Sequence, residues 1–263
     1  MSEQGKANGP ERPGRRPRAG DVSRPRDASV RALIFDFDGL ILDTETSSYE
    51  TARDVWAAHG ADLAIARWQD RIGTHRRPWI DDLEDLVGPI PDRDAVLERR
   101  IAAHHERLLA EAAMPGVHEL VVQAAASGLG MAIASSSSQS WVTEHLARLE
   151  LLEHFTVLSC WEEGLQPKPA PDVYLRALDR LGVAATEAVA FEDSPNGIAA
   201  AKAAGLRCIA VPNQMTAALD LSAADHVAAS FLDLDLRRIN MVGTRSARSS
   251  PTRRRGPSGP GAA

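Results

Sequence analysis

Two aspartates follow a short apolar run near the start of the chain and could act together. Asp36 and Asp38 come directly after Ala-Leu-Ile-Phe (32–35), and Gly39 follows them. Alternate side chains of a strand lie on the same face, so residues two apart can act on one substrate atom. Two carboxylates at the exit of a buried strand are costly unless a cation lies beside them. The pattern predicts a divalent metal and phosphoryl-transfer chemistry.

A second acidic pair ends another apolar run. Glu192 and Asp193 close the segment 188–192. Carboxylate oxygens are hard ligands that suit Mg²⁺, which keeps several waters and uses few protein carboxylates. Adjacent side chains of a strand point to opposite faces. We therefore expect Asp193 to bind the metal directly and Glu192 to stand behind it or to act through a water.

One lysine stands out in a chain that otherwise uses arginine. Lys168 lies between Pro167 and Pro169, and the chain has only three lysines against 27 arginines. Lysine is a compact point charge, and the prolines restrict the backbone that presents it. We expect Lys168 to neutralise a phosphate and the Asp36 carboxylate.

A serine run follows the apolar segment 130–134. Hydroxyl and backbone N–H donors at a strand-to-helix turn can hold the oxygens of a transferring phosphoryl group. Ser135 is the first residue of the run 135–138. Because serine runs are also common in loops and helix caps, the roles of Ser136 and Ser137 stay open.

The elements that must position these residues alternate along the chain. Apolar runs typical of buried parallel strands are bounded by turn signals and separated by segments with helical spacing. The expected strands are 32–36, 130–134, 155–159, 188–192 and 207–211, and the expected helices are 116–127, 139–149, 170–181 and 195–204. This alternation predicts an α/β fold with a doubly wound, mainly parallel, Rossmann-like sheet. All candidate residues then meet at the carboxyl edge of the sheet, where such folds bind ligands.

One interval breaks the alternation. Residues 45–113 contain no convincing strand and read as helices at 45–59, 77–87 and 92–112. We predict a small all-helical cap domain (45–113) inserted in an α/β core domain. The core would comprise residues 31–44 and 114–236, a disordered basic tail would span 1–30, and a disordered Arg-rich tail would span 237–263.

Composition narrows the classes of function. The chain has 263 residues and a net charge of −6, although residues 237–263 contain seven arginines and no acid. The part of the sequence between the two basic ends is therefore acidic. This argues against nucleic acid as the substrate, because binding a phosphate backbone requires a basic surface. Two cysteines give no disulfide framework, and no apolar stretch is long enough to span a membrane. We expect a cytoplasmic protein that acts on a small phosphorylated metabolite.

Four motifs in order resemble a known family. The segments 36–45 (Asp-Phe-Asp-Gly-Leu-Ile-Leu-Asp-Thr-Glu), 134–137, 168–172 and 191–197 resemble the signatures of the haloacid dehalogenase superfamily. The branch is that of the helical-cap phosphatases and the β-phosphoglucomutases. The resemblance covers residues 31–232 and implies a cap that closes over the substrate.

The resemblance also implies roles. Asp36 would be the nucleophile that forms an aspartyl-phosphate, as well as a metal ligand. Asp38 would protonate the leaving oxygen, take a proton from water later, and bind Mg²⁺ through its backbone carbonyl. Ser135 would bind the phosphoryl group, and Asp193 would complete the metal site. The dehalogenases of the superfamily lack the acid that Asp38 supplies, which favours phosphate chemistry.

The cap would select the substrate. The candidates for substrate binding are Thr44, Glu45, Ser48 and Arg76. Arg76 follows a glycine-containing loop and could present its guanidinium to an anionic or hydroxylated group. His104 and the adjacent His105 are expected on a helix surface.

Three functions remain to be weighed. The segment 45–113 contains no lysine, which argues against the phosphonate-cleaving branch, whose cap lysine forms a Schiff base. Ser48 stands where the mutase branch has a histidine, whereas Arg76 matches that branch. We therefore favour a Mg²⁺-dependent phosphatase acting on a small phosphomonoester such as a sugar phosphate. A sugar-phosphate mutase is the alternative, and a non-catalytic regulator that binds a phosphorylated ligand is the third possibility.

Overall fold

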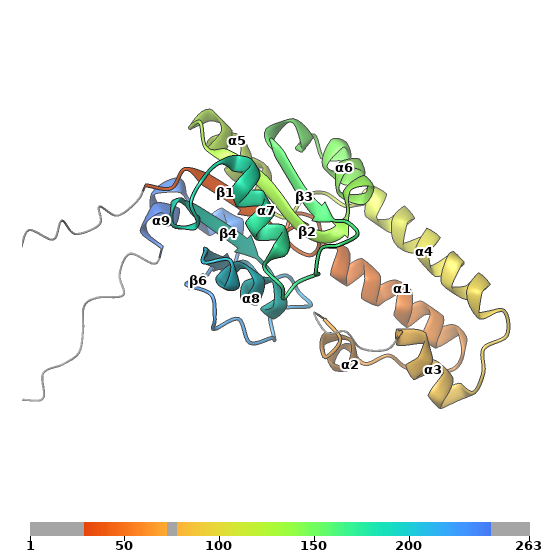
Figure 1. The fold of residues 1–263 in the computed structure, drawn as a ribbon. Coiled ribbons are helices and arrows are strands. Elements are labelled where there is room, and N and C mark those ends of the chain that lie inside the picture. The colour runs from red at the N-terminus through yellow and green to blue at the C-terminus, as the bar shows by residue number, and fades with distance from the viewer. Residues whose placement is uncertain (1–28, 73–77, 243–263) are drawn as a thin grey trace, which may run out of the picture.

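The computed structural model describes residues 29–72 and 78–242, which form a parallel sheet covered by helices and an inserted helical segment (Figure 1). The six strands are ordered β3-β2-β1-β4-β5-β6, and all neighbours pair in parallel. Their bounds are β1 Ala32–Phe35, β2 Gly130–Ser138, β3 Val157–Trp161, β4 Ala188–Glu192, β5 Arg207–Ala210 and β6 His226–Val227. The predicted fold class is confirmed.

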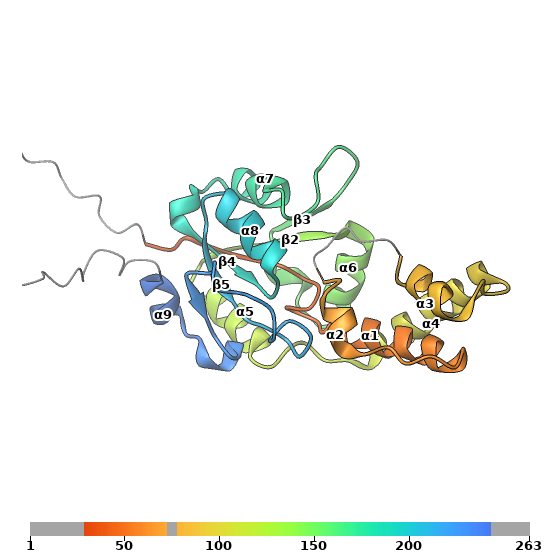
Figure 2. The same cartoon turned by 90° about the horizontal axis from the view of Figure 1, so that it is seen from below.

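Side-chain alternation along β1 sends two sets of residues to opposite faces. Leu33 and Phe35 join the core under α5 (Val117–Ala126) and α6 (Gln139–Arg148). Ala32 and Ile34 pack with α7 (Asp172–Leu181) and α8 (Pro195–Ala203). Figure 2 shows α7 and α8 on one side of the sheet and α5 on the other. Because both faces are covered, β1 is apolar and buried along its whole length, and β4 is apolar up to Glu192, as the continuous runs predict.

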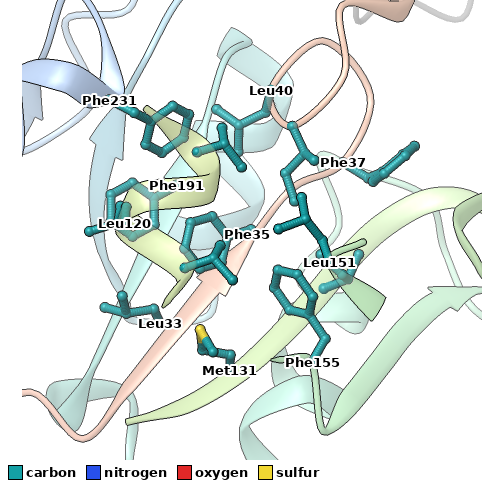
Figure 3. Packing of buried hydrophobic residues seen from close by; sticks show 14 of the residues in the cluster. Leu33, Phe35, Phe37, Leu40, Leu120, Met131, Leu151, Phe155, Phe191 and Phe231 are labelled. Carbon is teal, nitrogen blue, oxygen red and sulfur yellow. The ribbon is translucent and has the colours of Figure 1, made fainter. Parts of the chain in front are cut away.

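The larger core contains a cluster of phenylalanines that fixes the ends of the central strands (Figure 3). The rings of Phe35 and Phe191 stack with centroids 4.7 Å apart, and Phe155 meets Phe35 edge-on at 5.7 Å. Phe231 lies 5.6 Å from Phe191. Asp36 and Glu192 are the next residues after Phe35 and Phe191, so this packing sets where the two carboxylates emerge.

Helices α1 to α4 form the inserted segment and have a core of their own. They span α1 Thr44–Ala58, α2 Ile65–Gln69, α3 Trp79–Val87 and α4 Arg93–Ala110. Tyr49, Trp56, Trp68 and Ile80 are buried together there with Met215, which comes from a loop after β5. Gln69 Nε2 also donates to the backbone oxygen of Met215 at 3.0 Å. The predicted helical insertion is therefore present, with one short helix, α2, that periodicity did not reveal.

The ordered structure extends beyond the predicted core at both ends. Helix α9 spans Leu236–Met241, although a disordered tail was predicted from residue 237, and Ile239 is fully buried. Val30, placed in the N-terminal tail by the sequence, is buried and donates its N–H to Asn240 Oδ1 at 3.0 Å. Isolated apolar residues in polar surroundings give no periodic signal, so neither Val30 nor α9 was expected in the core. No helix among the residues that the structure describes is long and apolar enough to cross a membrane.

The phenylalanine cluster gives a stability prediction. Phe35→Ala removes a fully buried ring and leaves a cavity between Phe155 and Phe191, so the free energy of unfolding should fall by about 3–5 kcal/mol. Urea denaturation followed by circular dichroism measures the change. Leu232→Ala, at a side chain that is 67% exposed, is the control and should stay within about 0.5 kcal/mol. A loss below about 1 kcal/mol for Phe35→Ala would show that the cluster does not anchor β1.

Candidate active site

Lys168 lies between two carboxylates at the carboxyl edge of the sheet. Its Nζ donates to Asp36 Oδ1 at 2.6 Å and to Glu192 Oε1 at 2.7 Å, and all three side chains are at least nine-tenths buried. Burial lowers the pKa of the Lys168 ammonium, and the two carboxylates more than offset this and raise it above its usual value. The structure thus brings together three residues that the sequence predicts for the site, across 156 positions of sequence from Asp36 to Glu192.

Three carboxylates crowd this edge. One oxygen each from Asp36, Glu192 and Asp193 lies within 4.8 Å of the others. Burial raises the pKa of Asp36 to about 7, with Lys168 opposing and Glu192 adding to the shift. Burial and the neighbouring Asp36 raise the pKa of Asp193 well above its usual value. With all three carboxylates ionised, the cluster would carry more negative charge than the single Lys168 ammonium neutralises, and the raised pKa values reflect this.

The donor set fits a hard divalent cation. Glu192 Oε2 is buried and has no hydrogen-bond partner among the described residues. An unsatisfied buried carboxylate oxygen beside two further carboxylates is costly, and a cation with oxygen ligands removes the cost. Asp36 and Asp193, two of the three residues expected as ligands, belong to this cluster, and the third, Asp38, was expected to bind through its backbone carbonyl.

Glu192 is fixed from two sides. The Tyr174 hydroxyl, fully buried on α7, donates to Glu192 Oε1, and Lys168 Nζ lies 5.1 Å from the centre of the Tyr174 ring. On the other side α8 approaches so closely that a Cβ added to Gly197 would stand 1.7 Å from Glu192 Oε2. Ser194 caps this helix, and Pro195 is its first residue. Only glycine at position 197 allows the helix start to reach the carboxylate.

Asn213 holds Asp193 and was not predicted. Its Nδ2 donates to Asp193 Oδ2 at 2.8 Å and to the Gly39 carbonyl at 2.9 Å. Its Oδ1 accepts the backbone N–H groups of Met215 and Thr216, which fixes the orientation of the amide. An Asx turn of this kind is a common loop feature, so the sequence offered no signal that it supports an active-site carboxylate.

Gly39 allows the loop after β1 to approach the same carboxylate. Its φ is +77°, and an added Cβ would lie 2.4 Å from Asp193 Oδ2. A side chain at position 39 would therefore both strain the backbone and displace Asp193.

Asp38 faces β2 and the start of α6. Its Oδ2 accepts from Ser137 Oγ at 2.6 Å and from Ser135 Oγ at 3.4 Å, and its Oδ1 accepts from Trp141 Nε1 at 3.0 Å. Ser135 is fully buried, and its Oγ also accepts the Ser137 N–H. The serines that line the adjacent cavity are Ser136 and Ser137, the two whose roles the sequence left open, together with Ser48 and Ser194.

A cavity of about 380 Å³ lies between the sheet edge and the inserted helices. The core contributes Asp36, Asp38, Ser136, Ser137, Trp141, Lys168, Asp193 and Ser194, and the inserted segment contributes Thr44, Glu45, Ser48, Ile72 and His104. Three of the four predicted substrate residues are thus in the lining, and Arg76 lies outside the described residues.

A known protein family matches this chain over most of its length. The family model described as "haloacid dehalogenase-like hydrolase" matches residues 33–211 of the chain. The chain belongs to this family. The predicted family and the predicted enzyme class, a phosphohydrolase, are confirmed, and a non-catalytic regulator is set aside.

Two relatives that match most of this chain have names that describe them as phosphatases. A putative phosphatase of Bacillus subtilis, YhcW, is 39% identical over 209 residues, which cover 79% of this chain and 94% of the relative. Hexitol phosphatase B of Escherichia coli is 34% identical over 73% of this chain and 86% of its own length.

Solved structures agree with the assignment. The crystal structure of CbbY from Rhodobacter sphaeroides in complex with phosphate covers 78% of this chain and 96% of its own, with 30% identity and a TM-score of 0.63. The structure of a mutant of the same protein with xylulose-(1,5)bisphosphate has 28% identity and a TM-score of 0.62 over the same shares.

The position of His104, on the cap side of the cavity, differs from the one predicted. His104 was predicted on a helix surface, yet its ring lines the cavity, and its Nε2 lies 3.2 Å from the Thr44 carbonyl oxygen. His105 is partly exposed, as predicted, and pairs with Glu144 at 2.8 Å. Neighbouring residues of one helix point in different directions, so the pair could not share one environment.

Arg100 is a further residue of the cap that sequence reasoning missed. Its Nη2 donates to the Ser48 carbonyl at 2.8 Å and also to the Ser48 hydroxyl. Burial raises the pKa of nearby Glu45 to about 7, Asp38 and Asp43 add to the shift, and Arg100 opposes it. The contact joins α4 to α1 across 52 positions, and one arginine among 27 carried no distinguishing pattern.

The close approach at Gly197 gives a test with a defined sign. Gly→Ala within a helix normally stabilises by up to about 1 kcal/mol. Here Gly197→Ala should instead destabilise the hydrolase by at least about 2 kcal/mol, because the methyl group would overlap the buried Glu192 carboxylate. Urea denaturation measures the change.

Gly130→Ala is the matched control, since the nearest atom to its added Cβ would belong to the flexible Leu181 side chain, at 3.4 Å. It should change the free energy of unfolding by less than about 1 kcal/mol. A stabilising Gly197→Ala would mean that Glu192 is free to move away from α8.

Proposed function

We propose that this hydrolase is a Mg²⁺-dependent phosphatase that cleaves a small phosphomonoester, such as a sugar phosphate, through an aspartyl-phosphate on Asp36. The observation that carries the proposal is the pairing of Asp36 with Lys168 on the wall of a cavity of metabolite size, beside the buried carboxylates of Asp193 and Glu192. The sugar-phosphate class is supported by the names of two relatives, a hexitol phosphatase and a CbbY that binds xylulose-(1,5)bisphosphate.

Mg²⁺ would be held by the side chains of Asp36 and Asp193 and by the backbone carbonyl of Asp38, with Glu192 acting through a water. When bound, the ion offsets the repulsion between the nucleophile and the phosphate, which is about 4 kcal/mol per pair of unit charges at a separation of about 4 Å and an effective dielectric near 20. Asn213 keeps Asp193 directed at the cluster through its bond to Oδ2.

In the first half-reaction a carboxylate oxygen of Asp36 attacks phosphorus, and the bond from phosphorus to the leaving oxygen breaks. Asp38 gives its proton to that oxygen, so the product leaves as an alcohol. Lys168 stays bonded to Glu192 and balances charge on the acyl phosphate that forms.

In the second half-reaction Asp38 takes a proton from a water, and the resulting hydroxide equivalent attacks phosphorus. The bond from phosphorus to Asp36 breaks, which releases inorganic phosphate and restores both aspartates. Ser135 and its neighbours Ser136 and Ser137 supply hydroxyl and N–H donors for the phosphoryl oxygens at the end of β2.

The cap residues Thr44, Glu45, Ser48 and Arg76 would contact the part of the substrate beyond the phosphate. Their hydroxyl, carboxylate and guanidinium groups suit a polyol or a sugar. A cavity of about 380 Å³ accommodates a metabolite and not a polymer, and its acidic lining disfavours nucleic acid.

Water is favoured as the final acceptor over a second hydroxyl of a sugar. Ser48 replaces the histidine of the mutase branch, and its hydroxyl is bonded to Arg100 rather than directed at the acid Asp38. A mutase remains an outcome of the test below.

The nucleophile assignment predicts a complete loss of turnover. Asp36→Asn should lower kcat at least about 10⁴-fold on every member of a panel of sugar phosphates, polyol phosphates and p-nitrophenyl phosphate, because an amide cannot form the acyl phosphate. Released phosphate is measured with saturating Mg²⁺. Asp62→Asn, at a cap aspartate outside the cavity lining, is the control and should keep full activity.

Two results would contradict the proposal. Turnover by Asp36→Asn within about tenfold of the parent would remove the nucleophile from Asp36. Interconversion of sugar phosphates primed by a bisphosphate, without net release of phosphate, would replace the phosphatase with a mutase.

The metal assignment predicts a change in stability that does not depend on activity. Adding Mg²⁺ at about 100 times its Kd should raise the free energy of unfolding by about 2.7 kcal/mol. In Asp193→Asn the metal-free protein should be at least as stable as the parent, since a buried repulsive charge is gone, and Mg²⁺ should no longer stabilise it.

Thermal unfolding with EDTA and with a Mg²⁺ series measures both effects. Asp179→Asn, on the exposed side of α7, should respond to Mg²⁺ as the parent does. An equal Mg²⁺ response in Asp193→Asn would move the metal away from this cluster.

A further inference from the structure

The indole N–H of Trp141 is directed at the carboxylate of Asp38. Trp141 lies in the first turn of α6, where Ser138 caps the helix and its Oγ accepts the Trp141 backbone N–H at 3.4 Å. The side chain then reaches Asp38, and Nε1 donates to Oδ1 at 3.0 Å. Trp141 also lines the cavity, so this bond lies at the place where a substrate binds.

Two histidines hold the indole in place. His104 from α4 stacks against it with ring centres 6.1 Å apart and planes 26° apart. His145, one turn further along α6, meets it edge-on at 4.4 Å. His145 is fully buried and lies 6.3 Å from Phe37, the residue between the two aspartates. The direction of the indole N–H is therefore fixed by packing from α4, from α6 and from the loop after β1.

The chemistry of the donors distinguishes the two oxygens of Asp38. An indole nitrogen can only donate a hydrogen bond, whereas a serine hydroxyl can donate or accept. Trp141 occupies Oδ1 as a permanent donor, and Ser137 lies 2.6 Å from Oδ2. The two oxygens of Asp38 thus have different partners, and the bond from the indole to Oδ1 fixes the direction of the carboxylate.

We propose that Trp141 is a positioning residue that holds the Asp38 carboxylate through Oδ1, so that Oδ2 is aimed at the leaving oxygen of the substrate. The inference rests on the proposed function, because it takes Asp38 as the acid and base. Trp141 itself exchanges no proton, and the proton passes from Asp38 Oδ2 to the leaving oxygen as the bond from that oxygen to phosphorus breaks.

Leaving groups of different basicity separate this role from a structural one. The value of kcat/KM reports steps up to the departure of the alcohol. An alkoxide needs a proton to leave, whereas p-nitrophenolate leaves without one. Misplacing the acid should therefore lower kcat/KM for an alkyl phosphate and spare p-nitrophenyl phosphate.

The experiment compares a hexose 6-phosphate with p-nitrophenyl phosphate at saturating Mg²⁺. Trp141→Phe, which keeps an aromatic ring and lacks the N–H, should lower kcat/KM for the hexose phosphate at least about tenfold more than for the aryl phosphate. Replacing Trp141 with benzothienylalanine, whose sulfur takes the place of the N–H in a ring of nearly the same shape, should give the same ratio. Trp161→Phe, at a half-exposed tryptophan that ends β3, should leave both values unchanged.

Asp38→Asn separates failure of this inference from failure of the proposed function. If Asp38→Asn discriminates between the two substrates and the benzothienylalanine variant does not, the acid assignment holds and the positioning role is overturned. If Asp38→Asn itself lowers both values equally, Asp38 is not the acid, and the inference falls with the proposed function. Because the benzothienyl ring preserves packing against His104 and His145, its result decides the matter even if Trp141→Phe folds poorly.

Discussion

The structure depends on the confinement of three carboxylates at one edge of a parallel sheet, where one lysine bonds to two of them. Asp36, Glu192 and Asp193 repel one another and lose water only at a cost in free energy, and Lys168 offsets part of it. Many features nearby follow from this constraint. Gly39 and Gly197 allow the backbone to lie against the carboxylates, where any side chain would collide with them. Tyr174 and Asn213 donate hydrogen bonds to carboxylate oxygens. The arrangement favours a divalent cation before any substrate arrives.

The two aspartates after β1 experience different surroundings although one residue separates them. Asp36 is held by Lys168 and its pKa is raised to about 7 by burial, whereas Asp38 accepts hydrogen bonds from neutral groups on β2 and α6. Different surroundings suit the different tasks proposed for them, in which Asp36 bonds to phosphorus and Asp38 transfers protons. The stacked rings of Phe35 and Phe191 hold the ends of β1 and β4 side by side, which fixes the point where Asp36 leaves the sheet.

The sequence predicted the sheet, the helical insertion and the residues that meet at Lys168 because buried parallel strands and ordered motifs leave strong local patterns. It did not predict contacts that depend on the direction of a single side chain. Trp141, Asn213 and Arg100 have no distinctive spacing, and His104 differs from His105 only by the turn of about 100° between successive helical residues. Short elements such as α9 were missed because six residues give too few periods to detect.

Bonds within the site span very distant parts of the polypeptide. Lys168 is 132 positions from Asp36, Ser137 is 99 positions from Asp38, and Asn213 reaches a carbonyl 174 positions away. No fragment of the chain contains enough of these partners to assemble a working centre. Recovery of activity during refolding would thus report that the entire tertiary structure has formed. A proteolytic cut between these segments would abolish activity if the fragments dissociate.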